Sequence, residues 1–155
     1  MGIKDGVGIT GKMRAVTHDE FGNIYADTGW VENQQTNWSA DAVAQWYAGV
    51  NNTGYNPVKP PNYMELGTGS GTPAKTDVSL FTAVPATNQK CSVTSASTNQ
   101  ATLVCQYYGT ASNAGTYTEA GLMDSDGHLF GHLMASISIQ LGLSTTVTWI
   151  VSINA

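Results

Sequence analysis

The carboxyl-terminal half of this chain alternates apolar and polar residues with a period of two. In the segment 144–154, Thr145, Val147, Trp149, Val151 and Ile153 share one side, and the residues between them share the other. A strand that buries one face has this period. We predict further strands near residues 62–67, 89–96, 100–108, 115–123 and 128–136. The turns between them are rich in Gly, Asn, Asp and Ser, which is typical of antiparallel β proteins.

The amino-terminal half adds a hairpin and a helix. Residues 11–18 and 23–30 are predicted to pair, with Gly22 supplying a positive φ in the turn. The fold predicted is mainly β, a two-sheet sandwich of jelly-roll or related Greek-key type with one short helix. A barrel is the structural alternative.

The segment 39–50 is the predicted helix. Ser39 or Asn37 can cap it, and the apolar residues recur at helical spacing. Val43, Trp46, Tyr47 and Val50 fall on one face of this helix. Residues 51–62 contain three prolines and are predicted to form an extended surface loop.

A glycine-rich stretch, Glu65-Leu-Gly-Thr-Gly-Ser-Gly-Thr-Pro-Ala-Lys-Thr76, follows the strand predicted at 62–67. It departs from the phosphate-binding pattern G-x-x-x-x-G-K-[ST], because Ala74 stands where the second glycine belongs. Pro73 also removes one N–H donor from any phosphate cradle. We therefore interpret the stretch as a strand followed by a tight turn.

Charged residues make up only 11% of the 155 residues, and the net charge is −5. The length fits one domain. A sparsely charged surface suits a subunit packed among neighbours, since charge is costly to desolvate, and it also suits an adhesion domain. The acidic balance, with no Lys or Arg after Lys90, argues against nucleic acid as a partner. Membrane insertion is not expected either, because the apolar runs are too short. The N-terminus lacks the apolar core of a secretory signal, so synthesis in a cytoplasm is expected.

The two cysteines, Cys91 and Cys105, flank a hairpin predicted to turn at Thr98. They would then lie directly opposite each other, at a separation that permits a disulfide. Two buried thiols that pack as small apolar side chains are the alternative.

The polar residues predict neither a metal site nor a catalytic centre. His128 and His132 are four residues apart in a predicted strand, about 13 Å by the rise per residue, which is too far for one metal ion. The Asp124-Ser-Asp-Gly127 motif lacks the later Glu of a calcium loop and is better explained as a hairpin turn. Glu119, in mid-strand, is expected to accept hydrogen bonds from backbone or from a partner subunit. We predict no cofactor, no metal and no enzymatic activity.

The order of several segments resembles a family of small structural proteins of tailed-phage virions. These segments are Met1–Gly6, Gly11–Val16, Asp27–Asn33, Glu65–Ala74 with Thr76, Asp77 and Leu80, Thr118–Met123 and Thr146–Ile150. They span nearly the whole chain. The resemblance implies a β-sandwich and a role as a capsid- or tail-associated component.

Three classes of function follow. The first is a capsid decoration (cement) protein that binds and stabilises the major capsid shell, located on the capsid surface. The second is a tail, fibre or spike-base component with host-surface or glycan binding. The third is a carbohydrate-binding module that would use Trp38, Tyr55 and Tyr63 as stacking platforms. The resemblance favours the first two, and a single domain without coiled coil or collagen-like repeat favours decoration.

For a decoration protein, the expected partners are the chain itself, as a homotrimer, and the major capsid protein or neighbouring virion proteins. Residues 1–11 are predicted to form an arm, and 12–155 the sandwich domain. The arm holds four glycines and little that could fold alone. Its candidate contact residues are Ile3, Lys4, Val7 and Ile9.

Overall fold

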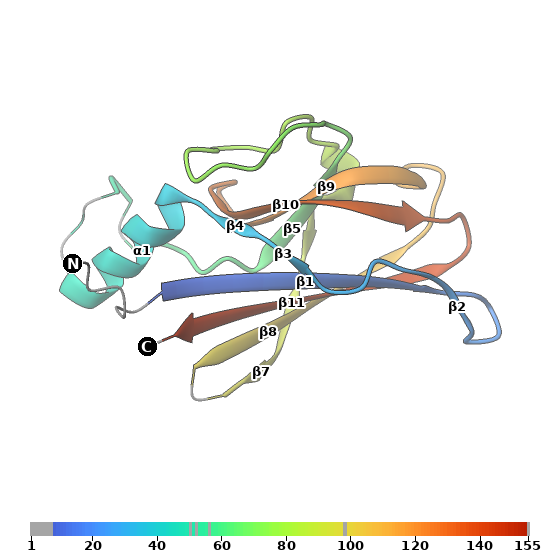
Figure 1. Cartoon of the computed structure of the whole chain (residues 1–155), viewed down its shortest axis with the longest axis horizontal. Coiled ribbons are helices and arrows are strands. Elements are labelled where there is room, and N and C mark those ends of the chain that lie inside the picture. Colours follow the sequence, from blue (N-terminus) through green and yellow to red (C-terminus); the bar gives the residue numbers. More distant parts are fainter. Residues whose placement is uncertain (1–7, 50, 52, 56, 98, 155) are drawn as a thin grey trace.

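Two antiparallel sheets packed face to face form the described part of the chain (Figure 1). The computed structural model describes residues 8–49, 51, 53–55, 57–97 and 99–154. The two-sheet sandwich predicted from the period-two pattern is confirmed. Helix α1 (Asn37–Ala48) lies at the end of the sandwich where β1 begins (Figure 1).

Within the described ranges, the first sheet has the strand order β2-β1-β11-β8-β7, with β3 also paired to β1. Its strands are β1 (Gly8–His18), β2 (Ile24–Asp27), β3 (Val31–Glu32), β7 (Ser92–Ala96), β8 (Gln100–Tyr108) and β11 (Ser144–Asn154). The second sheet has the order β4-β10-β9-β5-β6. Its strands are β4 (Gln34–Gln35), β5 (Tyr63–Gly67), β6 (Gln89–Lys90), β9 (Gly115–Met123) and β10 (Leu129–Ile139). A short 3-10 turn, η1 (Pro85–Thr87), precedes β6.

Strand β1 pairs with β11 along its whole length, from Gly8 opposite Asn154 to His18 opposite Ser144. The predicted arm boundary at residue 11 is therefore wrong, because residues 8–11 belong to this strand. Ile9, one of the arm residues, lies opposite Ile153. The other three, Ile3, Lys4 and Val7, lie outside the described residues.

The strands predicted at 100–108, 115–123 and 144–154 are confirmed with these bounds as β8, β9 and β11. The segment predicted as one strand at 89–96 is broken at Cys91, because the chain changes sheets there. Residues before Cys91 pair with β5 in the second sheet, and those after it pair with β8 in the first. The two-residue strands β3 and β4, which the sequence analysis missed, mark a second change of sheet at Asn33.

Glycines make room for the crossing at Asn33. A Cβ atom at Gly11 would lie 2.0 Å from the Asn33 Oδ1 atom, and one at Gly131 would lie 2.3 Å from its Nδ2 atom. Backbone also ties the crossing to β1, since the Asn33 N–H donates to the Gly11 carbonyl at 2.9 Å. The two sheets can approach here only because both positions lack a side chain.

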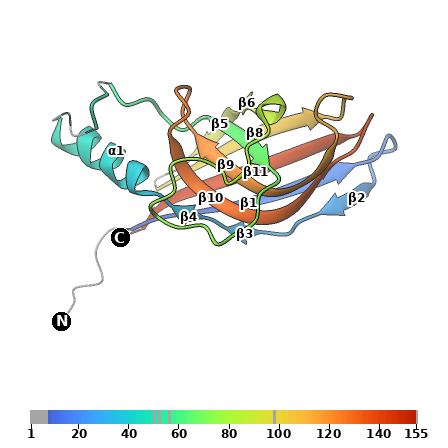
Figure 2. The same ribbon diagram turned by 90° about the horizontal axis from the view of Figure 1, so that it is seen from above.

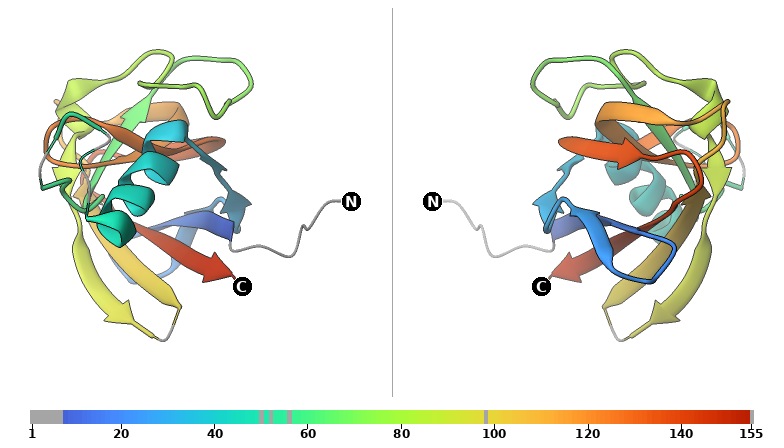
Figure 3. Two further views of the ribbon diagram at one scale, coloured as in Figure 1. Left: turned by 90° about the vertical axis from the view of Figure 1, so that its left-hand side faces the viewer. Right: turned by 90° about the vertical axis from the view of Figure 1, so that its right-hand side faces the viewer.

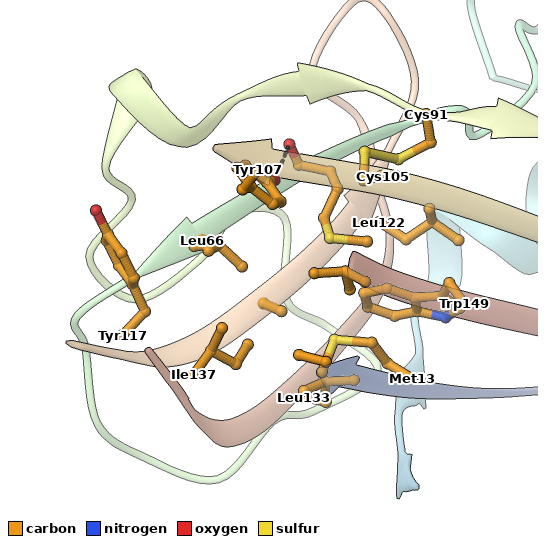
Figure 4. Packing of buried hydrophobic residues seen from close by; sticks show 14 of the residues in the cluster. Met13, Leu66, Cys91, Cys105, Tyr107, Tyr117, Leu122, Leu133, Ile137 and Trp149 are labelled. Atoms are coloured by element: carbon orange, nitrogen blue, oxygen red, sulfur yellow. Dashed lines mark hydrogen bonds between the residues drawn. A yellow bond between two sulfur atoms is a disulfide. The ribbon is translucent and has the colours of Figure 1, made fainter. Parts of the chain in front are cut away.

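The core lies between the two sheets. Figure 4 shows Trp149 and Met13, from neighbouring strands of the first sheet, pointing toward Leu66, Leu122 and Leu133 of the second. All five side chains are buried. One of the two sides predicted for the last strand faces the core, because Thr145, Val147 and Trp149 are buried and Val151 and Ile153 are half-buried.

Cys91 and Cys105 form a disulfide with a Cα–Cα separation of 4.4 Å, so the bridged alternative is the one present. Both cysteines are buried in the core cluster (Figure 4). The bridge joins β8 to the residue at which the chain changes sheets between β6 and β7. It therefore fixes a crossing between the two sheets.

Helix α1 begins two residues earlier than predicted, and its cap is Thr36, whose side chain accepts a hydrogen bond from the Ser39 N–H. The buried side of the helix, which carries Ser39, Ala42 and Gln45, differs from the apolar face read from the sequence. Ala42, together with the half-buried Trp38, packs with Val58 and Phe130, and Tyr47 is 86% exposed. Thr36 also anchors the first turn of the helix to β10, because its Oγ1 atom donates to the Leu129 carbonyl at 2.5 Å.

Among the described residues, no helix has the length and apolar character that crossing a bilayer requires.

Candidate functional site

The glycine-rich stretch becomes a long loop, residues 68–82, after β5 ends at Gly67. Figure 2, viewed from above, shows this green segment lying across β9 and β10, on the face of the second sheet that points away from the core. Leu80 is buried there in a small cluster with Met123 and Leu129. The loop thus forms a third layer over the sandwich.

A single buried carboxylate, Glu119 of β9, holds this loop. Its Oε2 atom accepts hydrogen bonds from the backbone N–H groups of Gly69 and Thr82, both at 2.8 Å. Its Oε1 atom accepts from the Phe81 N–H, also at 2.8 Å. The side chain is fully buried. The sequence-based expectation that Glu119 accepts backbone hydrogen bonds is confirmed.

His132 of β10 joins Glu119 to a second carboxylate. Its Nε2 atom lies 2.8 Å from Glu119 Oε1, and its Nδ1 atom lies 2.7 Å from Asp77 Oδ2. The imidazole is fully buried, and the Phe81 ring packs on it with the ring centroids 4.7 Å apart. An ionised carboxylate can only accept, so a ring nitrogen that faces one has to donate. Asp77 also accepts from the Ala74 N–H at 2.9 Å.

The glycines of the stretch are explained by this arrangement. A Cβ atom on either Gly67 or Gly69 would lie 2.6 Å from Glu119 Oε2, too close for any side chain. The backbone must approach the carboxylate closely, and only glycine permits that. In a phosphate-binding loop the N–H groups converge on a bound anion. Here they converge on an anion that the protein itself supplies.

The electrostatics favour ionised carboxylates in this network, which we call the Glu119 clamp (Asp77, His132, Glu119 and the N–H groups of Gly69, Phe81 and Thr82). Burial raises the pKa of Glu119, but the hydrogen bonds from Thr82, Phe81, His132 and Gly69 together outweigh it, and the net pKa is lowered. For Asp77, burial again raises the pKa. The hydrogen bonds from the Ala74 N–H and from His132 lower it by more, so the pKa of Asp77 is also below its usual value.

Acid is therefore expected to weaken the clamp. A carboxyl group whose pKa is depressed by folding stabilises the folded state above its unfolded pKa, near pH 4, and loses that contribution as the pH falls through its folded value. We expect the free energy of unfolding to decrease as the pH falls below about 4. Urea unfolding at a series of pH values measures this, with Glu119→Gln as the matched control. The free energy of unfolding should fall less steeply with decreasing pH in the variant than in the wild type. Equal dependence on pH in the two proteins would contradict the assignment.

A second polar cluster lies at the turn between β9 and β10. The turn predicted at Asp124–Gly127 is confirmed, with Gly127 at φ +88°. The side-chain ligand atoms of Asp124, Asp126 and His128 lie within 4.8 Å of one another. All three side chains already have partners within the protein. Asp124 accepts from the N–H groups of Asp126 and His128 and faces the His128 ring, while Asp126 pairs with Lys59. A lysine in this position competes with a cation for the Asp126 carboxylate.

The stacking platforms proposed for a carbohydrate-binding module are only partly available. Trp38 stacks on the His128 ring with the centroids 3.8 Å apart, and Tyr55 meets both rings edge-on. Tyr63 is half-buried against the Leu80 cluster. The expectation that Trp38 and Tyr63 are exposed is therefore wrong, because each packs against its own chain. Tyr55 remains 45% exposed.

The two histidines that the sequence placed four residues apart belong to separate clusters, His128 to the turn and His132 to the clamp. Sequence reasoning singled out Glu119 but missed Asp77 and His132 as its partners. Asp77 is 55 residues from His132, and no local pattern links them. The available signal was the presence of two ionisable residues, Glu119 and His132, within predicted strands.

No protein-family model matches the chain, and no curated protein or solved structure is significantly similar to it.

Proposed function

We propose that this chain is a structural protein of a phage virion, and that it acts as a capsid decoration protein that binds and stabilises the major capsid shell. The observation that carries the proposal is the Glu119 clamp. Two of the segments that resemble the virion family, Glu65–Ala74 and Thr118–Met123, meet in it, because the Gly69 N–H donates to Glu119. These segments therefore have one shared structural role, which supports a common architecture with that family.

The chemistry of the polar groups supports a binding role. The carboxylates of Asp77 and Glu119 are occupied by backbone N–H groups and by His132. Such a network orders a loop and gives it a fixed shape. The low charge of the chain, 11% of its residues, suits contacts with neighbouring subunits, where charge would have to be desolvated.

In this proposal, the protein assembles as a homotrimer on the capsid surface and contacts the major capsid protein. The Cys91–Cys105 disulfide suits a particle that is released into an oxidising medium. A decoration protein acts by mass action, because it binds the assembled shell and not the separate subunits.

The test is to prepare heads with and without the protein and to heat them at low and at high ionic strength. We expect undecorated heads to rupture at a lower temperature, and purified protein added back should restore the difference. Protection should be similar in both buffers, because an interface with few charges is weakly screened by salt. If heads without the protein are equally robust while adsorption to the host collapses, the tail or fibre alternative is correct.

A further inference from the structure

The two outer faces of the sandwich differ in what covers them. Figure 3, which views the molecule from its two ends, shows the green loop 68–82 over the second sheet, whereas no described segment lies over the outer face of the first. On β1, Met13 and Ala15 are buried and point to the core, and the exposed Lys12 between Gly11 and Met13 points outward. The first sheet therefore presents an open face with polar side chains.

A polar pocket of about 290 Å³ opens beside this face, where the chain passes from β3 to β4. Its volume is at the lower end of the range of about 300–1,000 Å³ that is usual for ligand pockets, so it suits one small molecule. Strands β1, β3, β4 and β11 all contribute to it. The lining consists of Ile9, Thr10, Gly11, Lys12, Glu32, Asn33, Gln34, Gln35 and Ile150.

The charges in this lining balance. One ammonium group comes from Lys12 and one carboxylate from Glu32, and the two residues lie directly opposite each other in the pairing of β1 with β3. A simple anion or cation bound here would meet a like charge on one side of the pocket. The balance therefore favours a ligand with no net charge.

The side-chain amides at the crossing add hydrogen-bonding groups of both kinds. The Gln35 Oε1 atom accepts from the Ser39 hydroxyl at 2.8 Å, and the Gln34 Nε2 atom donates to the Gln35 carbonyl at 2.8 Å. Each of these bonds fixes one polar atom of an amide. The other polar atom is an NH2 donor in Gln35 and a carbonyl acceptor in Gln34. A ligand that both donates and accepts matches this arrangement.

An aromatic ring lies next to the pocket. Trp30 comes directly before β3, and the Lys12 Nζ atom lies 4.9 Å from the centroid of its ring. This cation–π contact holds the ammonium group in place. The indole is nevertheless 46% exposed, which leaves apolar ring surface open to a ligand. Ile9 and Ile150 supply further apolar surface within the lining.

We propose that this pocket, together with the Trp30 ring, binds a neutral saccharide built of hexose or N-acetylhexosamine units. The hydroxyl groups of a sugar donate and accept, as the groups of the lining do. The C–H groups of its ring pack on an indole or an isoleucine side chain. The pocket takes one sugar unit, and a second unit linked to it packs on Trp30. The capsid role does not require this activity, so either can fail while the other holds.

Saturation-transfer difference NMR with the full-length chain tests the proposal. The probes are glucose, galactose, mannose, N-acetylglucosamine, cellobiose, lactose and chitobiose, with free glutamine as an uncharged-overall amino acid for comparison. Trp30→Ala removes the ring, and Glu32→Gln removes the carboxylate at nearly constant shape. Their matched controls are Trp46→Ala, a tryptophan 47% exposed on α1, and Glu20→Gln, an exposed glutamate of the turn between β1 and β2. Thermal melts check that all variants fold.

We expect the wild-type chain to transfer saturation to at least one saccharide, most strongly to the C–H protons of its ring. Trp30→Ala and Glu32→Gln should each weaken the binding of that saccharide by about tenfold, the usual effect of losing one well-placed contact. Both controls should bind as the wild type does. In a titration of the wild type, the indole N–H signal of Trp30 should shift and that of Trp46 should stay in place. If Trp30→Ala does not fold, Glu32→Gln decides.

Three outcomes would overturn the proposal. One is the absence of saturation transfer to every saccharide among the probes. Another is binding that survives Trp30→Ala and Glu32→Gln but is lost in Trp46→Ala, which would place the sugar at the helix. The third is transfer to glutamine and to no saccharide, which would assign the pocket to an amino acid.

Discussion

Replacing Glu119 with glutamine is expected to lower the free energy of unfolding by about 3–5 kcal/mol, the usual cost of breaking a buried charged network at one partner. The carboxylate accepts hydrogen bonds from Gly69, Phe81 and Thr82 and faces His132. An amide keeps only one acceptor oxygen, and its NH2 group would point at N–H donors. For a chain of this length the melting temperature should fall by roughly 6–20 °C. Differential scanning calorimetry and urea unfolding both measure the effect.

The matched control is Glu65→Gln. Glu65 lies on β5, directly opposite Gly121 of β9, and is only half-buried. Its side chain receives one long hydrogen bond, from Asn88 at 3.5 Å. We expect this control to lie within about 1 kcal/mol of the wild type. Equal effects at Glu65 and Glu119 would mean that the clamp contributes no special stability.

Removing the disulfide is expected to have the next largest effect. The bridge closes a loop with a sequence separation of 14 residues. Chain-entropy arguments assign about 3 kcal/mol to a loop of this size. The double variant Cys91→Ala/Cys105→Ala should therefore melt roughly 6–12 °C below the wild type. Two alanines replace the cysteines in the variant, so a cavity adds to the loss.

Treatment with a reductant separates the contribution of the disulfide from that of the cavity left by the alanines. Wild-type protein treated with a strong reductant should move toward the double variant, while the variant itself should not respond. Thiol titration of the folded, untreated protein should find no reactive cysteine, because the described residues include no free cysteine. Two reactive thiols in the untreated protein, or a reductant effect on the variant, would contradict the assignment.

The β-strands could be predicted because their signal is local. In β11, the alternation placed Val147 and Trp149 on the same side of the strand, and both are buried. The position of each strand in its sheet could not be predicted in this way. The breaks at Asn33 and Cys91 come from changes of sheet, and a change of sheet depends on partners far along the chain.

The helix shows the limit of periodicity. Its spacing correctly indicated a helix, but the tertiary contacts made by Thr36 and Ala42 decided which face packs. Of the larger apolar residues, Val43 stays half-buried and Trp46 stays 47% exposed. A periodic pattern identifies an apolar face without identifying what covers it.

Only part of the Glu119 clamp could be predicted from the sequence. A carboxylate in mid-strand at Glu119 must find donors if it is buried, and the expectation of backbone donors followed from that rule alone. Which donors it finds was not predictable, because they lie 37, 38 and 50 residues away along the chain. The sequence analysis interpreted the glycines at 67 and 69 as part of a strand and tight turn, and the structure adds that a carboxylate of the same chain lies beside them.

Native-state hydrogen exchange of the wild-type protein tests most directly the claim that loop 68–82 is a structural layer held from within. The Gly69, Phe81 and Thr82 amides donate to Glu119, so we predict that they exchange as slowly as amides of β9 and β10. Exposed amides of the same loop should exchange much faster. If the three amides exchange at the rate of an open loop, or become protected only after a phosphate compound is added, the loop is a ligand-binding element and the account is wrong.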